Sequence, residues 1–366
     1  MQRTSHRSAT VLMGKYVAEN LDKKPHFHLW TPEEKSVNLS RKLRRSMINR
    51  RNIRSKVMQE LYALLTEKEA TRQADPERSV RRLFTNLENI YKLYVLLLNL
   101  PVEIRRREAN LLELRKKKHL KTPEDLHPDT HLLDNRIGQL LEQNRQLEKE
   151  TARYGLQHIW AGEPELVRHL LDRVKASEPY KQYVRIKNPD FKADKLFALD
   201  AYKNVIAPSE KLHGFLENME INWADDIAIA NTMVMKTLDR FSPNDTADKP
   251  LSPLFKSEDD REFGRNLLLH TYQNRDELSE IIAGKVKNWD FNRLSQVDKI
   301  LLMMGLAEML YFPTIPPTVS INEYVEIAKE FSTPKSNKFI NGILDSAYKD
   351  LLSQNRIHKV SETPKN

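Results

Sequence analysis

Residues 293–310 read RLSQVDKILLMMGLAEML and contain most of the longest apolar stretch of the chain. Ser295 followed three residues later by Asp298 is typical of a helix start, where a side chain caps backbone N–H groups and an acid lies in the first turn. Residues 300–310 are then almost all apolar, which predicts a helix buried on most sides. Glu308 interrupts that run and needs a hydrogen-bond partner. We expect a structural carboxylate, because the second titratable group that acid–base catalysis requires is not apparent.

Two further helices are predicted after this one. Pro313, Pro316 and Pro317 break the chain. Residues 320–323 have the pattern of a capping box, so we expect a helix from there to residue 331. The last helix carries an apolar stripe, preceded by Lys338 and Phe339. An aromatic ring beside a cation at a helix N-terminus suits an unstacked base and its phosphate, and the alternative is that Phe339 is an ordinary core residue.

Helical periodicity dominates the rest of the sequence as well. Residues 53–65, 77–100 and 131–153 each carry an apolar stripe, and residues 102–118 read as a charged helix that follows a break at Pro101. Thr122 before Pro123 predicts another helix start. No long run alternates with a period of two, and the chain has only 9 glycines. The predicted fold class is therefore all-α.

A candidate internal repeat links two of these helical regions. The segment from Phe197 to Trp223 has the same length as the segment from Phe263 to Trp289, and an Asn-Trp pair ends both of them. The alternative is coincidence between two amphipathic regions, which share apolar spacing by necessity. If the repeat is real, residues 160–241 form a degenerate copy of the C-terminal module.

Composition excludes several classes of function. The 366 residues suffice for two or three domains, and 60 Lys and Arg against 51 Asp and Glu give a net charge of +9. The absence of cysteine excludes disulfides, thiolate zinc sites and cysteine nucleophiles. No apolar run approaches the ~20 residues of a membrane span, so we expect a cytoplasmic protein with no membrane partner. No phosphate-binding glycine loop is present, so no cofactor is expected, and His127 and His131 read as surface histidines rather than metal ligands.

The densest basic segment spans residues 41–56 and reads RKLRRSMINRRNIRSK, with eight Lys or Arg and no acid. It continues directly into the amphipathic pattern of residues 53–65. One interpretation is a solvated, disordered tail that aids solubility. The other is an arm that neutralises the phosphates of a nucleic acid. Composition alone leaves both open.

Three stretches together resemble one family. Residues 317–345, PTVSINEYVEIAKEFSTPKSNKFINGILD, resemble the signature of NusB, the bacterial transcription antitermination factor. Residues 293–310 resemble that family's preceding helix, and residues 49–65, NRRNIRSKVMQELYALL, resemble its Arg-rich N-terminal helix. The matched stretches lie far apart in the chain. The sequence therefore resembles a long form of NusB, in which a helical bundle is split by a large helical insertion.

The resemblance implies a non-enzymatic factor that binds boxA RNA of ribosomal RNA operon transcripts. It would act with NusE, a small-subunit ribosomal protein, and reach the RNA polymerase elongation complex through other Nus factors. The family's RNA-binding positions carry over to Arg50, Arg51, Arg54, Lys338 and Phe339. Lys56 is added from charge alone. The weaker NusE-facing positions carry over to Tyr62 and Asp298.

The resemblance also divides the chain. We expect a module formed by residues 47–100 and 257–352 around an insertion at 101–256. Residues 1–46 would form an extension of unknown role and residues 353–366 a polar tail. An alternative function is a helical scaffold whose insertion binds another protein, with only non-specific RNA binding. An RNA-modifying enzyme is set aside, because no glycine-rich cofactor loop or catalytic cysteine exists.

Overall fold

The computed structural model describes residues 48–71, 75–286 and 294–360, and every regular element within those ranges is helical. The prediction of an all-α fold is therefore confirmed. The chain forms two compact units. Of the described residues, unit 1 holds 48–87 and 255–360, whereas unit 2 holds 88–254. None of the helices described is long and apolar enough to cross a bilayer.

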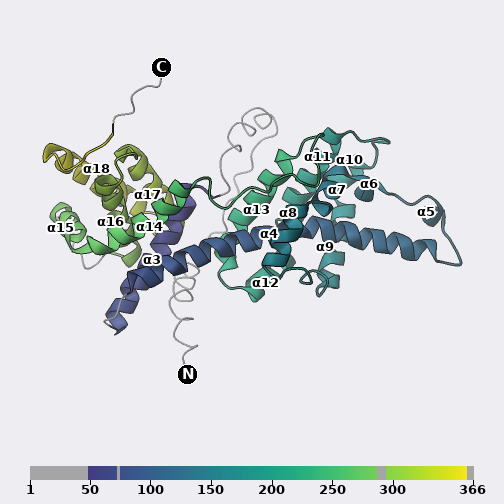
Figure 1. Ribbon diagram of the computed structural model, residues 1–366, viewed down its shortest axis with the longest axis horizontal. Helices are drawn as coiled ribbons and strands as arrows, with labels where there is room; N and C mark the ends of the chain where they lie inside the picture. Colours follow the sequence, from purple (N-terminus) through teal and green to yellow (C-terminus); the bar gives the residue numbers. More distant parts are fainter. Residues whose placement is uncertain (1–47, 72–74, 287–293, 361–366) are drawn as a thin grey trace, which may run out of the picture. The chain divides into compact units, whose positions relative to one another are not determined.

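Unit 1 is built from helices at both ends of the sequence (Figure 1). α3 (Arg50–Thr71) and the first turns of α4 (Pro76–Lys116) come from the N-terminal side. The C-terminal side contributes α14 (Glu258–Gln273), α15 (Arg275–Lys285), α16 (Gln296–Tyr311), α17 (Pro317–Phe331) and α18 (Ser336–Ser353). Because α3 packs against α14 and α16, segments distant in sequence share one core.

α16 is the central helix of unit 1. It contacts α3, α14, α15, α17 and α18, and its residues 297–309 are buried except Lys299. The Ser295 side chain accepts a hydrogen bond from the backbone N–H of Asp298 at 3.1 Å, so the predicted N-cap is confirmed. A nearly uniform apolar sequence suits this position, because a helix that has neighbours on every side needs no polar face.

The predicted start of α17 is wrong. The helix begins at Pro317, and Ser320 lies one turn inside it, fully buried. The Ser320 hydroxyl donates to the Glu308 carboxylate instead of capping the helix. Proline is well suited to the first helical position, where its missing N–H would have no partner. The signal for the helix start is therefore the Pro316–Pro317 pair.

The predicted helix break at Pro101 is also wrong, because α4 continues through it. Proline removes one backbone hydrogen bond and costs ~3 kcal/mol in a helix interior. Leu97, Leu98 and Leu100 before it are fully buried, and the Trp160 indole N–H donates to the carbonyl of Leu96 at 3.0 Å. The Asn99 amide donates to the carbonyl of Val95 at 2.9 Å. Burial of this apolar turn outweighs the local preference of proline.

Unit 2 continues from the middle of α4. Its Thr122 side chain accepts from the N–H of Asp125, which confirms the predicted cap. The core contains the fully buried Trp223 and Tyr202, and an ion pair joins the half-buried Lys175 to the buried Glu108 at 2.6 Å. The elements after α4 are α5 (Pro123–Leu126), α6 (His131–Asp134), α7 (Arg136–Glu142), α8 (Arg145–Arg153), α9 (Pro164–Ala176), α10 (Glu178–Tyr183), α11 (Phe191–Ala201), the π-helical turn η2 (Tyr202–Ile206), α12 (Glu210–Met219) and α13 (Trp223–Arg240).

The candidate repeat stays a prediction. Shifted by 66 residues, α11 with η2 overlaps α14, and α12 overlaps α15. α13 begins at Trp223, whereas α16 begins at Gln296, seven residues later than this shift would place it. Trp289, the partner of Trp223 in the repeat, lies outside the described residues. The N-terminal extension 1–46 also lies outside them, as do residues 361–366 of the expected polar tail.

The described part of that tail folds back onto α16. The Lys359 ammonium donates to the carbonyls of Phe312 at 2.7 Å and Glu308 at 3.3 Å. The backbone N–H of Val360 donates to the carbonyl of Pro313 at 3.1 Å. A cation at the C-terminal end of α16 complements the negative end of the helix dipole.

We predict that Gly264→Ala destabilises the protein by about 1 kcal/mol. A Cβ at Gly264 would lie 2.8 Å from Cγ2 of Ile53, a stiff β-branched side chain. Overpacking costs ~1–3 kcal/mol, which outweighs the ~1 kcal/mol gained in helix propensity. Gly342→Ala is the matched control, since its Cβ meets nothing within 4 Å. Urea unfolding that shows Gly264→Ala to be as stable as Gly342→Ala would refute this account of the α3–α14 contact.

Candidate nucleic-acid interface

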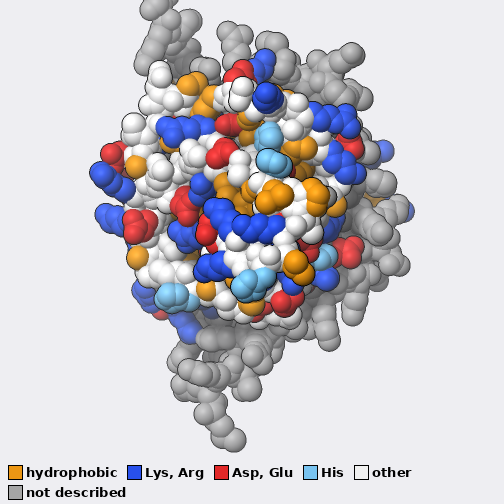
Figure 2. Space-filling view, turned by 90° about the vertical axis from the view of Figure 1, so that its right-hand side faces the viewer, with side chains coloured by type: hydrophobic (Ala, Val, Ile, Leu, Met, Phe, Trp, Pro, Cys, Tyr) orange, Lys and Arg blue, Asp and Glu red, His pale blue; other side chains and the backbone are white. Residues whose placement is uncertain are grey.

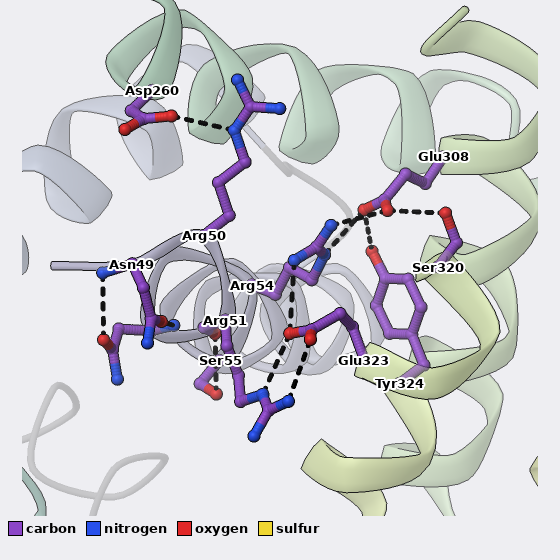
Figure 3. Close-up of polar contacts among 11 residues, drawn as sticks. Asn49, Arg50, Arg51, Arg54, Ser55, Asp260, Glu308, Ser320, Glu323 and Tyr324 are labelled. Carbon is purple, nitrogen blue, oxygen red and sulfur yellow. Dashed lines mark hydrogen bonds and ion pairs between the residues drawn. The ribbon is translucent and has the colours of Figure 1, made fainter. Parts of the chain in front are cut away.

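A buried ion pair joins α3, which carries the predicted RNA-binding arginines, to α16. Arg54 of α3 donates two hydrogen bonds to Glu308 of α16, from Nε at 2.8 Å and from Nη2 at 2.7 Å (Figure 3). The same carboxylate accepts from the Ser320 hydroxyl at 2.7 Å and the Tyr324 hydroxyl at 3.0 Å. The predicted structural role of Glu308 is thus confirmed.

This pair is isolated from solvent. Arg54 is 2% exposed and Glu308 is 0% exposed. Burial opposes the charged form of Arg54, but the hydrogen bonds and charge of Glu308 outweigh it and raise the pKa of the guanidinium. The pKa of Tyr324 is also raised, by burial first and by the Glu308 charge second. The Tyr324 hydroxyl therefore stays protonated and donates to the Glu308 carboxylate.

Two predicted RNA contacts need correction on these grounds. Arg54 is engaged with Glu308 and stacked 5.0 Å over the Phe263 ring, so it has no face for a nucleic acid. Lys56 is only 6% exposed. Charge alone could not separate these two from their neighbours. The burial of Arg54 and Lys56 follows from the packing of α3 against α14 and α16.

Arg50 and Arg51 lie nearer the surface. Their side chains are 37% and 36% exposed. Arg50 donates to Asp260 at 2.8 Å and lies 5.0 Å from the Phe263 ring. Figure 3 shows Arg50 directed toward Asp260, Arg51 toward Glu323, and Arg54 toward Glu308. Both surface arginines are therefore accessible to a ligand, but each already has an acidic partner.

The partner of Arg51 is Glu323 of α17. Arg51 donates from Nε and Nη2 to the two carboxylate oxygens, both at 2.9 Å. This bidentate bond lowers the pKa of Glu323 and raises that of Arg51. Glu326 and Glu330 add to the negative field around Arg51, and burial raises the pKa of Glu330. An RNA phosphate would have to replace Glu323 at the guanidinium.

Lys338 and Phe339 lie in the first turn of α18. Lys338 is exposed and Phe339 is half-buried, so part of the ring is accessible to solvent beside a cation. The first turn of this helix contains no acidic residue, and Lys335 just before it is exposed as well. α17 packs against both α3 and α18, and so it contacts the helices that carry both groups of predicted RNA contacts.

Asp298, a predicted NusE-facing residue, is 6% exposed, which corrects that prediction. Its carboxylate accepts from the Ser332 hydroxyl at 2.6 Å and the Ser336 hydroxyl at 2.9 Å. It therefore fixes the turn from α17 into α18 and positions Lys338 and Phe339. Sequence reasoning missed the two serines, although their separation of four residues was a signal. Tyr62 is half-exposed on α3 and remains accessible.

We predict that Arg54→Met costs ~3–5 kcal/mol of stability, because it leaves the Glu308 charge buried without its partner. The double variant Arg54→Met/Glu308→Leu should lose less, since no charge remains buried, although the Ser320 and Tyr324 hydroxyls lose their acceptor. Arg265→Met, which breaks the exposed pair with Glu77, is the control and should cost below about 1 kcal/mol. Urea unfolding gives the free energy of unfolding of the unchanged protein and of the three variants. Equal losses of stability for Arg54→Met and Arg265→Met would contradict the role of the buried pair.

Comparison with known proteins relates this chain to one family. The NusB family model matches residues 228–349. The transcription antitermination protein NusB of Salinibacter ruber is 38% identical over 136 residues, which cover 36% of this chain and 85% of that protein. The NusB of Methylacidiphilum infernorum is 48% identical over 99 residues, covering 27% of this chain and 68% of the relative.

Two further matches are more partial. The NusB of Chloroherpeton thalassium is 43% identical over 99 residues, 27% of this chain and about half of that relative, 47%. A solved structure of T. maritima NusB has 35% sequence identity over 26% of this chain and 66% of that one, with a TM-score of 0.25. The identity to the Salinibacter ruber protein, over most of that protein's length, shows that this chain belongs to the NusB family of transcription antitermination proteins.

Proposed function

We propose that this protein binds boxA RNA of ribosomal RNA operon transcripts together with NusE, as a non-enzymatic antitermination factor. The observation that carries the proposal is the exposed Lys338 beside the half-buried Phe339, in a helix turn without acidic residues. A base can stack on the solvent-exposed part of the ring, while the ammonium and the helix N-terminus attract the adjacent phosphate. The match to NusB proteins supports the same conclusion.

Arg50 and Arg51 complete the proposed RNA surface, and Arg54 and Lys56 are removed from it. The ion pair between Arg51 and Glu323 is partly exposed and bidentate. Such a pair holds the guanidinium in one orientation and releases it at a modest cost. In the proposed mechanism a phosphate takes the place of Glu323, so the free protein keeps Arg51 oriented but partly neutralised.

The proposed NusE surface rests on Tyr62. This side chain lies on α3 and is half-exposed, whereas Asp298 acts indirectly through the turn before α18. RNA binding and NusE binding would then use different parts of unit 1. The proposed contacts to the elongation complex would run through NusE and other Nus factors, as the family resemblance implies.

The proposed function is tested by RNA binding with a sequence control. The full chain is titrated with a boxA RNA and a scrambled RNA of equal length, with and without NusE, at two salt concentrations. We expect a preference for boxA that becomes stronger with NusE, and an affinity that falls with salt at a slope of ~0.7 per phosphate contact. Equal binding of both RNAs, without an effect of NusE, would overturn the proposal.

We predict that Phe339→Ala weakens boxA binding between about 5-fold and 150-fold, equivalent to the ~1–3 kcal/mol of one stacked base. Leu352→Ala is the matched control, because Leu352 is a 49% exposed apolar residue at the other end of the same helix. Circular dichroism checks that both variants are folded. An unchanged affinity of folded Phe339→Ala would exclude stacking on this ring.

We predict that Glu323→Gln strengthens RNA binding by a few fold, because it removes the anion that competes with phosphate for Arg51. The gain should be larger at low salt, since it arises from charge. Glu262→Gln removes an equal charge from an exposed position of α14 and serves as the control. If both variants change the affinity equally, the effect is one of net charge, and the direct competition at Arg51 is refuted.

A further inference from the structure

The end of α4 and the segment through α5 form an exposed projection of unit 2, which we call the α4–α5 tip (residues 113–127). Lys116, Lys117, Lys118 and Lys121 are exposed on it. Leu114, Leu120 and Leu126 are 63%, 90% and 60% exposed, although leucine is usually buried. Figure 2 shows this side of the molecule, with Lys and Arg side chains gathered next to hydrophobic ones.

The positive charge of unit 2 is concentrated at this end. Residues 88–254 contain 26 Lys and Arg and 26 Asp and Glu, so the unit has no net charge. Residues 105–121 contain eight Lys and Arg and two acids, and the remainder of the unit contains 18 basic and 24 acidic residues. The tip itself, residues 113–127, contains five Lys and Arg and three acids. A neutral unit with one basic end and an acidic remainder directs a polyanion to that end.

Part of this charge is neutralised within the protein. Arg105 and Arg106 are paired with Glu142, so they are engaged within the unit. At the tip, Lys116 pairs with Glu113 and Lys118 with Asp125. Within the described side chains, Lys117 and Lys121 have no ion-pair partner. These two ammonium groups are the cations most accessible to an external ligand.

The tip is held in one conformation by local hydrogen bonds. Thr122 and Asp125 form a reciprocal capping box, in which each side chain accepts from the other residue's backbone N–H. Lys118 adds an ion pair to the same Asp125 carboxylate at 3.0 Å. The loop that carries Leu120 and Lys121 therefore ends at a fixed turn, which lowers the entropy lost when a ligand binds.

We propose that the α4–α5 tip is a second RNA-binding surface, which takes single-stranded RNA through its backbone, independently of base sequence. Lys117 and Lys121 neutralise phosphates, and the exposed leucines give apolar contact to the faces of unstacked bases and to riboses. Charge complementarity favours RNA as the occupant, because phosphates recur along the strand. The inference builds on the proposed function, in which the protein is already bound to a transcript.

The experiment measures binding of the full chain to an unstructured RNA of about 30 nucleotides without a boxA sequence, at about 50 and about 200 mM KCl. The test variant is Lys117→Glu/Lys121→Glu. The control is Lys192→Glu/Lys211→Glu, which makes the same charge change at exposed positions of α11 and α12. Because the RNA lacks boxA, the result does not depend on sequence-specific binding by unit 1.

We expect the test variant to bind at least 10-fold more weakly at the lower salt concentration, with a salt slope reduced by ~1.4 for two lost phosphate contacts. The control should change the affinity by less than about 3-fold, through net charge alone. Both variants should bind a boxA RNA of about 12 nucleotides as the unchanged protein does, which separates this inference from the proposed function.

Two results would overturn the inference. Equal losses in the test and control variants would show that only net charge matters. Unchanged RNA binding by the test variant would show that the tip does not bind RNA, and would leave an acidic protein as its ligand. Failure of the unchanged protein to prefer boxA would refute the proposed function instead, and the comparison of the two variants would still stand.

Discussion

The buried pair between Arg54 and Glu308 is the constraint on which unit 1 depends. One carboxylate inside the most apolar helix accepts hydrogen bonds from α3 and from two hydroxyls of α17. Burying a charge is costly unless its partners are complete, and here every partner comes from a different turn or helix. The pair therefore fixes how α3 and α17 lie on α16. Because Arg50 and Arg51 lie on the same helix as Arg54, their positions depend on this pair as well.

The same constraint divides a run of arginines that looks uniform in the sequence. Arg54 points into the core, while Arg50 and Arg51, one turn earlier on α3, stay near the surface. A second buried carboxylate, Asp298, orients α18 as Glu308 orients α3. It accepts hydrogen bonds from Ser332 and Ser336, where α17 turns into α18. Two buried acids of α16 thus orient the two groups of side chains proposed to contact RNA.

Much of the fold could be predicted from the sequence, because apolar spacing and caps are local. The cap at Ser295 and the buried character of α16 follow from such patterns. The continuation of α4 through Pro101 could not, because burial around Trp160 and Leu96 decides it. Likewise, charge marked Arg54 and Lys56 as candidate contacts, whereas the direction of each side chain depends on the helix packing. The family signature identified Lys338 and Phe339, and their exposure is visible only in the structure.

Hydrogen exchange of the full chain, with and without boxA RNA and NusE, shows whether the pair between Arg54 and Glu308 stays closed when RNA binds. We expect slow exchange around Arg54 and Glu308 in the free protein, and new protection on RNA binding at the start of α18 and around Arg51. Protection that appears at the Arg54 turn, with the start of α18 unchanged, would contradict this expectation. That result would mean that the buried pair opens to bind RNA and does not serve as a fixed support.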